Sequence, residues 1–214
     1  MNGRIDKIFS FLIGRRKQII YGFFGVYLFV ALLLVIGSIS VVERDSNSLF
    51  FYRLGVTFGK CAVLVFVVTL IPGIATRFGM KHRVFSLIRI FRRYIGILVY
   101  LLVLSHSWLV SIFPRLLTWP NSGTFMLFEL FGIAASILLF SLFITSNDWS
   151  VVKLKSLWYL LHRLVYIIMW FILFHVGLQR LSFWSFLMGV TVFLMMVSFM
   201  ADYLRKRQTP MPTS

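Results

Sequence analysis

Long uninterrupted apolar runs are the feature that most constrains what this chain can fold into. Six such runs, nearly free of charged residues, lie at 19–42, 54–75, 94–113, 125–144, 157–178 and 183–203. A helix of about 20 apolar residues crosses the roughly 30 Å of hydrocarbon in a bilayer. The runs lack the two-residue alternation of barrel strands. The sequence therefore predicts an all-α integral membrane protein, a bundle of about six transmembrane helices.

The composition agrees with a bilayer as the solvent. Only 13% of the 214 residues are charged and 60% are hydrophobic, whereas about 25% of the residues in a soluble domain are charged. The formal net charge of +16 could indicate nucleic-acid binding. The basic residues, however, are confined to short segments between the apolar runs, where they act as topology signals. We therefore expect the lipid bilayer, and no nucleic acid, as a partner.

The distribution of Lys and Arg predicts the orientation. These residues crowd the N-terminus, the second and fourth connections and the C-terminal tail. The opposite side carries only Arg44, Arg53, Arg115 and Arg180. The positive-inside rule therefore predicts both termini in the cytoplasm and a multi-pass protein of the plasma (inner) membrane. We expect a basic cytoplasmic segment at 1–18, a six-helix domain at 19–204 and a cytoplasmic tail at 205–214.

Three histidines lie within apolar runs, where polar side chains are functional candidates by default. His106 is late in the third run, and His162 and His175 are early and late in the fifth. The predicted topology puts His106 and His175 at one outer level, with His162 about 20 Å away on the inner side. Two imidazoles at one depth on neighbouring helices can ligate a b-type haem from both faces. Alternatively, each histidine only forms hydrogen bonds between helices. His82, in a basic connection, is expected at the surface.

Helical geometry raises a difficulty for the inner level. Thirteen residues leave His162 and His175 about 140° apart around an ideal helix, so both can face a site only with a kink, a π-bulge or two separate pockets. Arg92 lies about 40° from the helix face of His106. An inner haem bound by His162 would meet this arginine, a poor iron ligand but a good partner for haem propionates. Arg93 and Arg163 are further candidates for the propionates.

Three stretches resemble one known family. They are 92–106 (RRYIGILVYLLVLSH), 142–148 (LFITSND) and 158–175 (WYLLHRLVYIIMWFILFH). The chain resembles the ferric reductase-like transmembrane domain family, which includes the membrane parts of ferric reductases and NADPH oxidases. In size it is closest to the short haem-binding membrane subunits of bacterial methionine sulfoxide reductase systems.

The resemblance implies that haem b is bound by histidines of the third and fifth spans. His106 and His175 match the outer-level ligands of the haem iron, and His162 matches an inner-level ligand. The inner histidine of the third span is absent, and Arg92 or Arg93 stands there instead, so the resemblance implies one haem and leaves a second open. The 214 residues contain no Gly-rich dinucleotide fingerprint. We therefore expect flavin only through a partner.

The resulting hypothesis is a cytochrome b-like electron-transfer subunit of an oxidoreductase, without its own substrate or nucleotide site. It would carry electrons across the membrane from a cytoplasmic flavin reductase or the quinone pool to an extracytoplasmic redox protein. Two alternatives stay open. One is a haem-free small transporter or assembly module, and the other is the membrane half of a ferric reductase with a separate flavin subunit.

A few other residues carry weaker expectations. Gly96 and Gly132 could allow close approach of a macrocycle, although small residues also serve simple helix packing. Glu129 is expected to reach the outer interface, and Lys60, inside the second run, to extend its amine toward the headgroups. The Pro72-Gly73 pair is expected to end the second span.

Overall fold

The computed structural model describes residues 2–43, 46–80, 82–120 and 123–208, and in the first helix the side chains of Lys7 and residues 9–14. Within these ranges most residues are helical and none is in a strand. The elements are α1 (Asn2–Gly14), α2 (Arg16–Glu43), α3 (Ser48–Arg77), α4 (Arg83–Ser107), the π-helix η1 (Trp108–Ile112), α5 (Phe113–Leu117), α6 (Leu127–Ile144), α7 (Asp148–Leu154), α8 (Ser156–His162), α9 (Val165–Gln179) and α10 (Phe183–Gln208).

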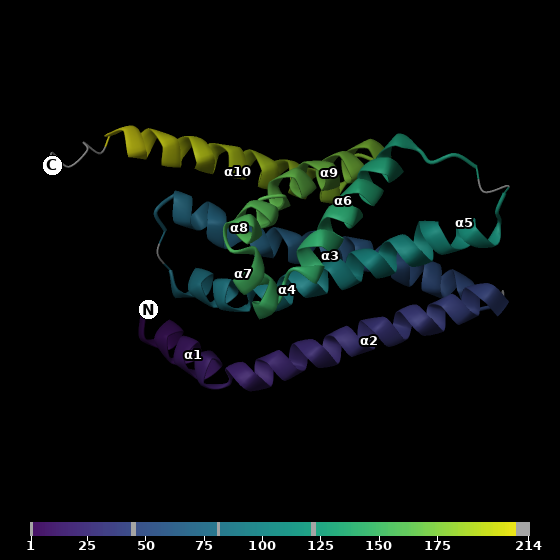
Figure 1. The fold of residues 1–214 in the computed structure, drawn as a ribbon, viewed down its shortest axis with the longest axis horizontal. Coiled ribbons are helices and arrows are strands. Elements are labelled where there is room, and N and C mark those ends of the chain that lie inside the picture. The colour runs from purple at the N-terminus through teal and green to yellow at the C-terminus, as the bar shows by residue number, and fades with distance from the viewer. Residues whose placement is uncertain (1, 44–45, 81, 121–122, 209–214) are drawn as a thin grey trace.

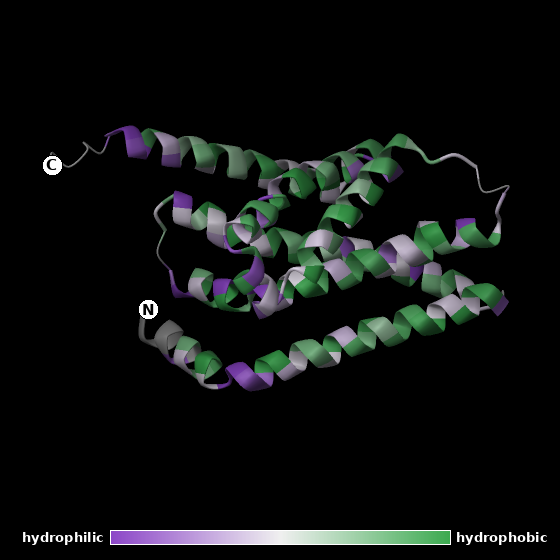
Figure 2. Cartoon of the chain, in the orientation of Figure 1, coloured by the Kyte–Doolittle hydropathy of each residue, from purple (hydrophilic) through white to green (hydrophobic). Residues whose placement is uncertain are grey.

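Six helical segments of the described chain are long and apolar enough to cross a membrane, which confirms the predicted fold class. Four of them are single helices, and two are composite: Arg83–Leu117 joins α4, η1 and α5, and Ser156–Gln179 joins α8 and α9. An 18-residue stretch within each segment has a mean hydropathy between 1.8 and 2.7. Figure 2 shows hydrophobic residues along the middle of the helices and hydrophilic residues gathered toward their ends.

The bundle is built on two helix pairs. The long helices α3 and α4 pack along each other, and α6 packs on α9. Helix α10 lies on α3 and α9, and α2 covers the other side of α4 (Figure 1). The main core between these helices is apolar and includes Phe66, Val99, Ile168 and Met188. Large apolar side chains also cover the outer surface of α2, as the lipid-facing side of a span requires.

The two ends of the described chain lie at the same end of the bundle. Helix α1 and the last turn of α10 are at the same end of the long axis (Figure 1). A chain with an even number of spans begins and ends on the same side of the membrane. Which side of the membrane this end faces stays a prediction from the Lys and Arg distribution.

Helix irregularities fall close to the candidate residues. The π-helix η1 begins two residues after His106, and α8 ends at His162, so that the fifth span is interrupted before α9 begins at Val165. The 140° offset between His162 and His175 left a kink, a π-bulge or two separate pockets open, and the structure has a break in this span. Lys155, with φ 46°, turns the chain between α7 and α8.

The expected end of the second span at Pro72-Gly73 was wrong. Helix α3 continues through Pro72 to Arg77. The proline removes only the one helical hydrogen bond that its own N–H would donate. In a packed membrane helix such a loss is tolerated, and the helix continues beyond the proline.

Candidate functional site

His106 and His175 face each other between two helices at one level of the bundle. Their ring centroids are 6.2 Å apart, and the ring planes are inclined at 73°. Each Nδ1 lies within hydrogen-bond distance of a backbone carbonyl of another helix: Gly55 at 3.0 Å for His106 and Phe128 at 2.8 Å for His175. A carbonyl can only accept, so Nδ1 carries the proton in both rings. The unprotonated Nε2 is then the atom available as a metal ligand.

Two glycines bring the backbone of neighbouring helices against these rings. A Cβ added to Gly59 in α3 would lie 2.7 Å from Nδ1 of His106, and one added to Gly132 in α6 would lie 2.7 Å from Nδ1 of His175. Any side chain would therefore displace the ring. In the structure, Gly132 allows the close approach of the His175 ring; its approach to a macrocycle stays a prediction. Gly96 lines a cavity, and an added Cβ there would meet nothing within 4 Å.

The spacing of the two rings fits one metal ion held between two imidazoles. A metal–imidazole bond is about 2 Å long and a ring nitrogen lies roughly 1 Å from the ring centre, so ligation on opposite faces separates the centres by about 6 Å. The observed 6.2 Å matches this separation. The hydrogen bonds from Nδ1 to carbonyls are the outer-shell contacts that metal-ligating histidines usually make.

His162 has a different environment at the other end of the fifth span. Its Nε2 lies 3.3 Å from the Thr145 hydroxyl, and its ring lies against Trp158 with centroids 4.0 Å apart. The Trp158 indole donates to the Thr145 carbonyl at 2.9 Å. These contacts fix α8 on the end of α6. His162 is therefore engaged at the nitrogen that His106 and His175 leave available.

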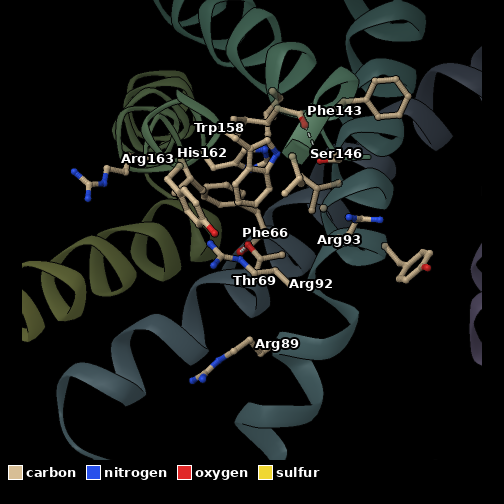
Figure 3. Close-up of a pocket in the computed structure, with 18 of the residues that line it drawn as sticks. Phe66, Thr69, Arg89, Arg92, Arg93, Phe143, Ser146, Trp158, His162 and Arg163 are labelled. Carbon is tan, nitrogen blue, oxygen red and sulfur yellow. Dashed lines mark hydrogen bonds between the residues drawn. The ribbon is translucent and has the colours of Figure 1, made fainter. Parts of the chain in front are cut away.

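His162 is one of the residues that line a cavity of about 840 Å³. It falls within the usual size of small-molecule sites, about 300–1,000 Å³. Its lining brings together the four inner-level residues that the sequence singled out, His162, Arg92, Arg93 and Arg163. Figure 3 shows that the Arg163 side chain extends away from the His162 and Trp158 rings. The cavity thus combines positive charge with aromatic walls, which suits an anionic ligand with a flat apolar body.

One of the cavity arginines is held by an acidic partner. Arg93 Nη2 donates to Asp148 Oδ1 at 2.6 Å, joining α4 to the first turn of α7. The Asp148 side chain is otherwise exposed. The hydrogen bond from Arg93, together with its positive charge, holds the pKa of Asp148 below its usual value. The pair therefore ties the short α7 to the cavity wall at neutral pH.

Several contacts at these sites were not predicted from the sequence. The two carbonyl acceptors, from Gly55 and Phe128, have no residue signature because every residue carries a carbonyl. Gly59 was missed because it lies far from His106 in the chain.

Glu129 was expected to reach the interface, and its pairing with Arg115 was not predicted. Its carboxylate pairs with Arg115 at 2.7 Å, and its side chain is 17% exposed. Lys60 is exposed on α3, and the reach of its amine to the headgroups stays a prediction.

The membrane-spanning fold agrees with what the family comparison finds. The model of the family described as ferric reductase like transmembrane component matches residues 54–173. The match covers more than half of the chain, so the chain belongs to this family.

Two curated proteins are similar to parts of the chain. Both are named protein-methionine-sulfoxide reductase heme-binding subunit MsrQ. The one from Agrobacterium fabrum is 33% identical over 95 residues, which are 43% of this chain and 44% of that protein. The one from Rhizobium meliloti is 36% identical over 81 residues, 36% of this chain and 38% of that protein. The similarity thus spans less than half the length of either relative. No solved structure matches the chain.

Proposed function

We propose that this chain is a membrane electron-transfer subunit that binds haem b between His106 and His175. The geometry of these two rings is the observation that carries the proposal: their centroids are 6.2 Å apart and each Nδ1 is directed at a carbonyl. Membership of the ferric reductase like family supports it. So do the two relatives, which are named as haem-binding subunits.

The residues of the chain have separable tasks in this proposal. His106 and His175 would hold the iron through Nε2, while the Gly55 and Phe128 carbonyls fix the rotation of both rings and increase their basicity. A haem bound there supplies a one-electron carrier whose iron alternates between the ferrous and ferric states. Between this level and the inner cavity, buried apolar side chains such as Val99, Ile168 and Met169 exclude water.

The inner cavity is the proposed entry point for electrons. We infer that His162 and Arg92 contact an anionic group there, with Arg93 and Arg163 adding positive charge. The propionates of a second haem would suit these arginines, and arginine recognises carboxylates well. A second haem at this level stays open because Nε2 of His162 is engaged by Thr145.

Direction and partners follow from the predicted orientation. The basic end of the bundle would face the cytoplasm, so the donor would be a flavin reductase or quinol on that side, and the acceptor an extracytoplasmic redox protein. The protein would lie in the plasma membrane. A methionine sulfoxide reductase is the acceptor that the names of the relatives suggest.

Reduced-minus-oxidised spectra of the purified protein test the proposal. We expect a haem b spectrum from the wild-type chain and from His82→Ala, a surface control. Loss of bound haem is expected in both His106→Ala and His175→Ala. A wild-type preparation that stays colourless after haem supplementation would instead favour a haem-free membrane module. The cross-helix hydrogen bonds of His106, His162 and His175 are the observation consistent with that alternative.

A further inference from the structure

An ion pair joins α5, which follows His106 in the same span, to α6, which provides the carbonyl that orients His175. Nη2 of Arg115, in α5, lies 2.7 Å from both carboxylate oxygens of Glu129, in α6. Both side chains are largely shielded, with 22% and 17% exposure. The Arg115 guanidinium also lies over the Phe125 ring, 4.2 Å from its centroid. Helix α5 continues the span that carries His106.

The same carboxylate completes the first turn of α6. The residue that precedes this helix is Met126, whose side chain makes no capping hydrogen bond. Oε2 of Glu129 accepts from the Met126 backbone N–H at 2.8 Å instead. Phe128, immediately before Glu129, provides the carbonyl at 2.8 Å from Nδ1 of His175. The acceptor that orients His175 is thus in the turn that Glu129 closes.

The two imidazoles differ in how firmly their acceptors are held. The Gly55 carbonyl, which faces His106, is inside the 30-residue helix α3 and is held by regular helix hydrogen bonds on both sides. The Phe128 carbonyl is in the second residue of α6, and the preceding residues 123–126 are not helical. Helix ends fray unless side chains satisfy their free backbone groups. The acceptor of His175 therefore depends on Glu129 in a way that the acceptor of His106 does not.

We propose that the Arg115–Glu129 pair is a positioning device for His175, and that it sets the ligand strength of this imidazole by fixing the Phe128 carbonyl. This inference rests on the proposed function, because it concerns the ligation of a haem by His175. Arg115 holds the carboxylate, the carboxylate holds the first turn of α6, and that turn holds the acceptor of Nδ1. Shielded ion pairs often contribute little to stability. The pair is therefore best understood through the geometry that it imposes.

The expected consequence is electronic as well as structural. A short hydrogen bond from Nδ1 to a carbonyl makes the imidazole a more basic ligand, which stabilises ferric over ferrous iron. If the first turn of α6 loosens, this hydrogen bond lengthens. The iron potential should then rise, and haem should leave more readily.

The experiment uses the full-length protein, purified with haem. The variants are Glu129→Gln, Glu129→Ala and Arg115→Gln, with Glu43→Gln as a matched control that removes an exposed carboxylate at the end of α2. Redox titration gives the midpoint potential, and transfer to apomyoglobin gives the haem dissociation rate. We expect the potential to rise in the order wild type, Glu129→Gln, Glu129→Ala. Haem dissociation should be on the order of tenfold faster in Glu129→Ala, at the low end of what loss of a ligand's hydrogen-bond partner causes.

The outcomes separate this inference from a purely structural role. If Glu129→Gln and Glu129→Ala lower the unfolding temperature but their retained haem keeps the wild-type potential and spectrum, the positioning role is refuted. Should Glu129→Ala fail to fold, the potentials of Glu129→Gln and Arg115→Gln decide in the same way. A wild-type protein that binds no haem would overturn the proposed function and this inference together. A wild-type haem spectrum with unshifted variants would overturn only the inference.

Discussion

The substitution Gly132→Ala tests the contact between α6 and His175 most sharply. An added Cβ at this position would lie 2.7 Å from Nδ1 and 2.8 Å from Cε1 of His175, whereas ordinary van der Waals contact begins at 3.4 Å. The ring must therefore move by about 0.7 Å, or the helices must separate. A movement of this size is large compared with the tolerance of the 2.8 Å hydrogen bond to Phe128.

The expected loss of haem affinity follows from the overlap between the added Cβ and the His175 ring. Overpacking in a well-packed interior typically costs about 1–3 kcal/mol. If this cost falls on the haem-bound state and not on the haem-free state, haem affinity should fall by about 5- to 150-fold. Glycine to alanine otherwise favours a helix by roughly 0.5–1 kcal/mol. A loss of haem affinity in Gly132→Ala would therefore come from the contact with His175 and not from a weakened helix.

The assay is haem titration of purified protein, with Gly177→Ala as the matched control. Gly177 is in α9, two residues from His175, and a Cβ added there meets nothing within 4 Å. We expect Gly177→Ala to bind haem like the wild type and Gly132→Ala to bind it at least several-fold more weakly. If both variants bind with wild-type affinity, the ring does not occupy the described position against α6, and the argument from ring spacing loses its basis.

Two further predictions concern the other histidine and the cavity wall. Gly59→Ala should weaken haem binding in the same way, through His106. Gly189→Ala should not weaken it, because a Cβ added there meets nothing within 4 Å. Haem titration of both variants checks this. The second concerns pH. Because pairing with Arg93 lowers the pKa of Asp148 in the folded protein, its stabilising contribution is present above the ordinary value of 3.8 and is lost as pH falls through the lowered pKa. Thermal unfolding measured from pH 7 down to pH 3 should therefore show a smaller acid destabilisation in Asp148→Asn than in the wild type, and equal slopes would contradict the pairing.

Much of the fold could be predicted from the sequence because hydropathy alone determines the spans. The six apolar runs correspond to the six membrane-spanning segments, apart from their ends. The shared level of His106 and His175 was also predictable, because shared depth requires only the span directions. The offset between His162 and His175 allowed either an interruption of the fifth span or two separate pockets; the structure has an interruption before Val165 and places the two histidines in different environments.

The details of the sites could not be predicted, for reasons of chemistry. Backbone acceptors such as the Phe128 carbonyl have no signature in a sequence. The contact of Gly59 with His106 depends on how α3 crosses α4, which hydropathy does not encode. The partner of Glu129 depends on the path of the chain through η1 and α5, because Arg115 lies beyond the π-helix. Without that path, an acidic residue near a span end is most simply expected at the interface.

Low-temperature electron paramagnetic resonance of the oxidised, haem-supplemented protein tests the central claim most directly, because it reports the ligands of the iron. Two imidazoles with planes inclined at 73° predict a low-spin ferric signal of high anisotropy, since nearly perpendicular ligand planes leave two iron orbitals close in energy. Replacing either His106 or His175 by alanine should remove that signal. A high-spin signal in the wild type, or a low-spin signal that survives both replacements, would contradict ligation by this pair.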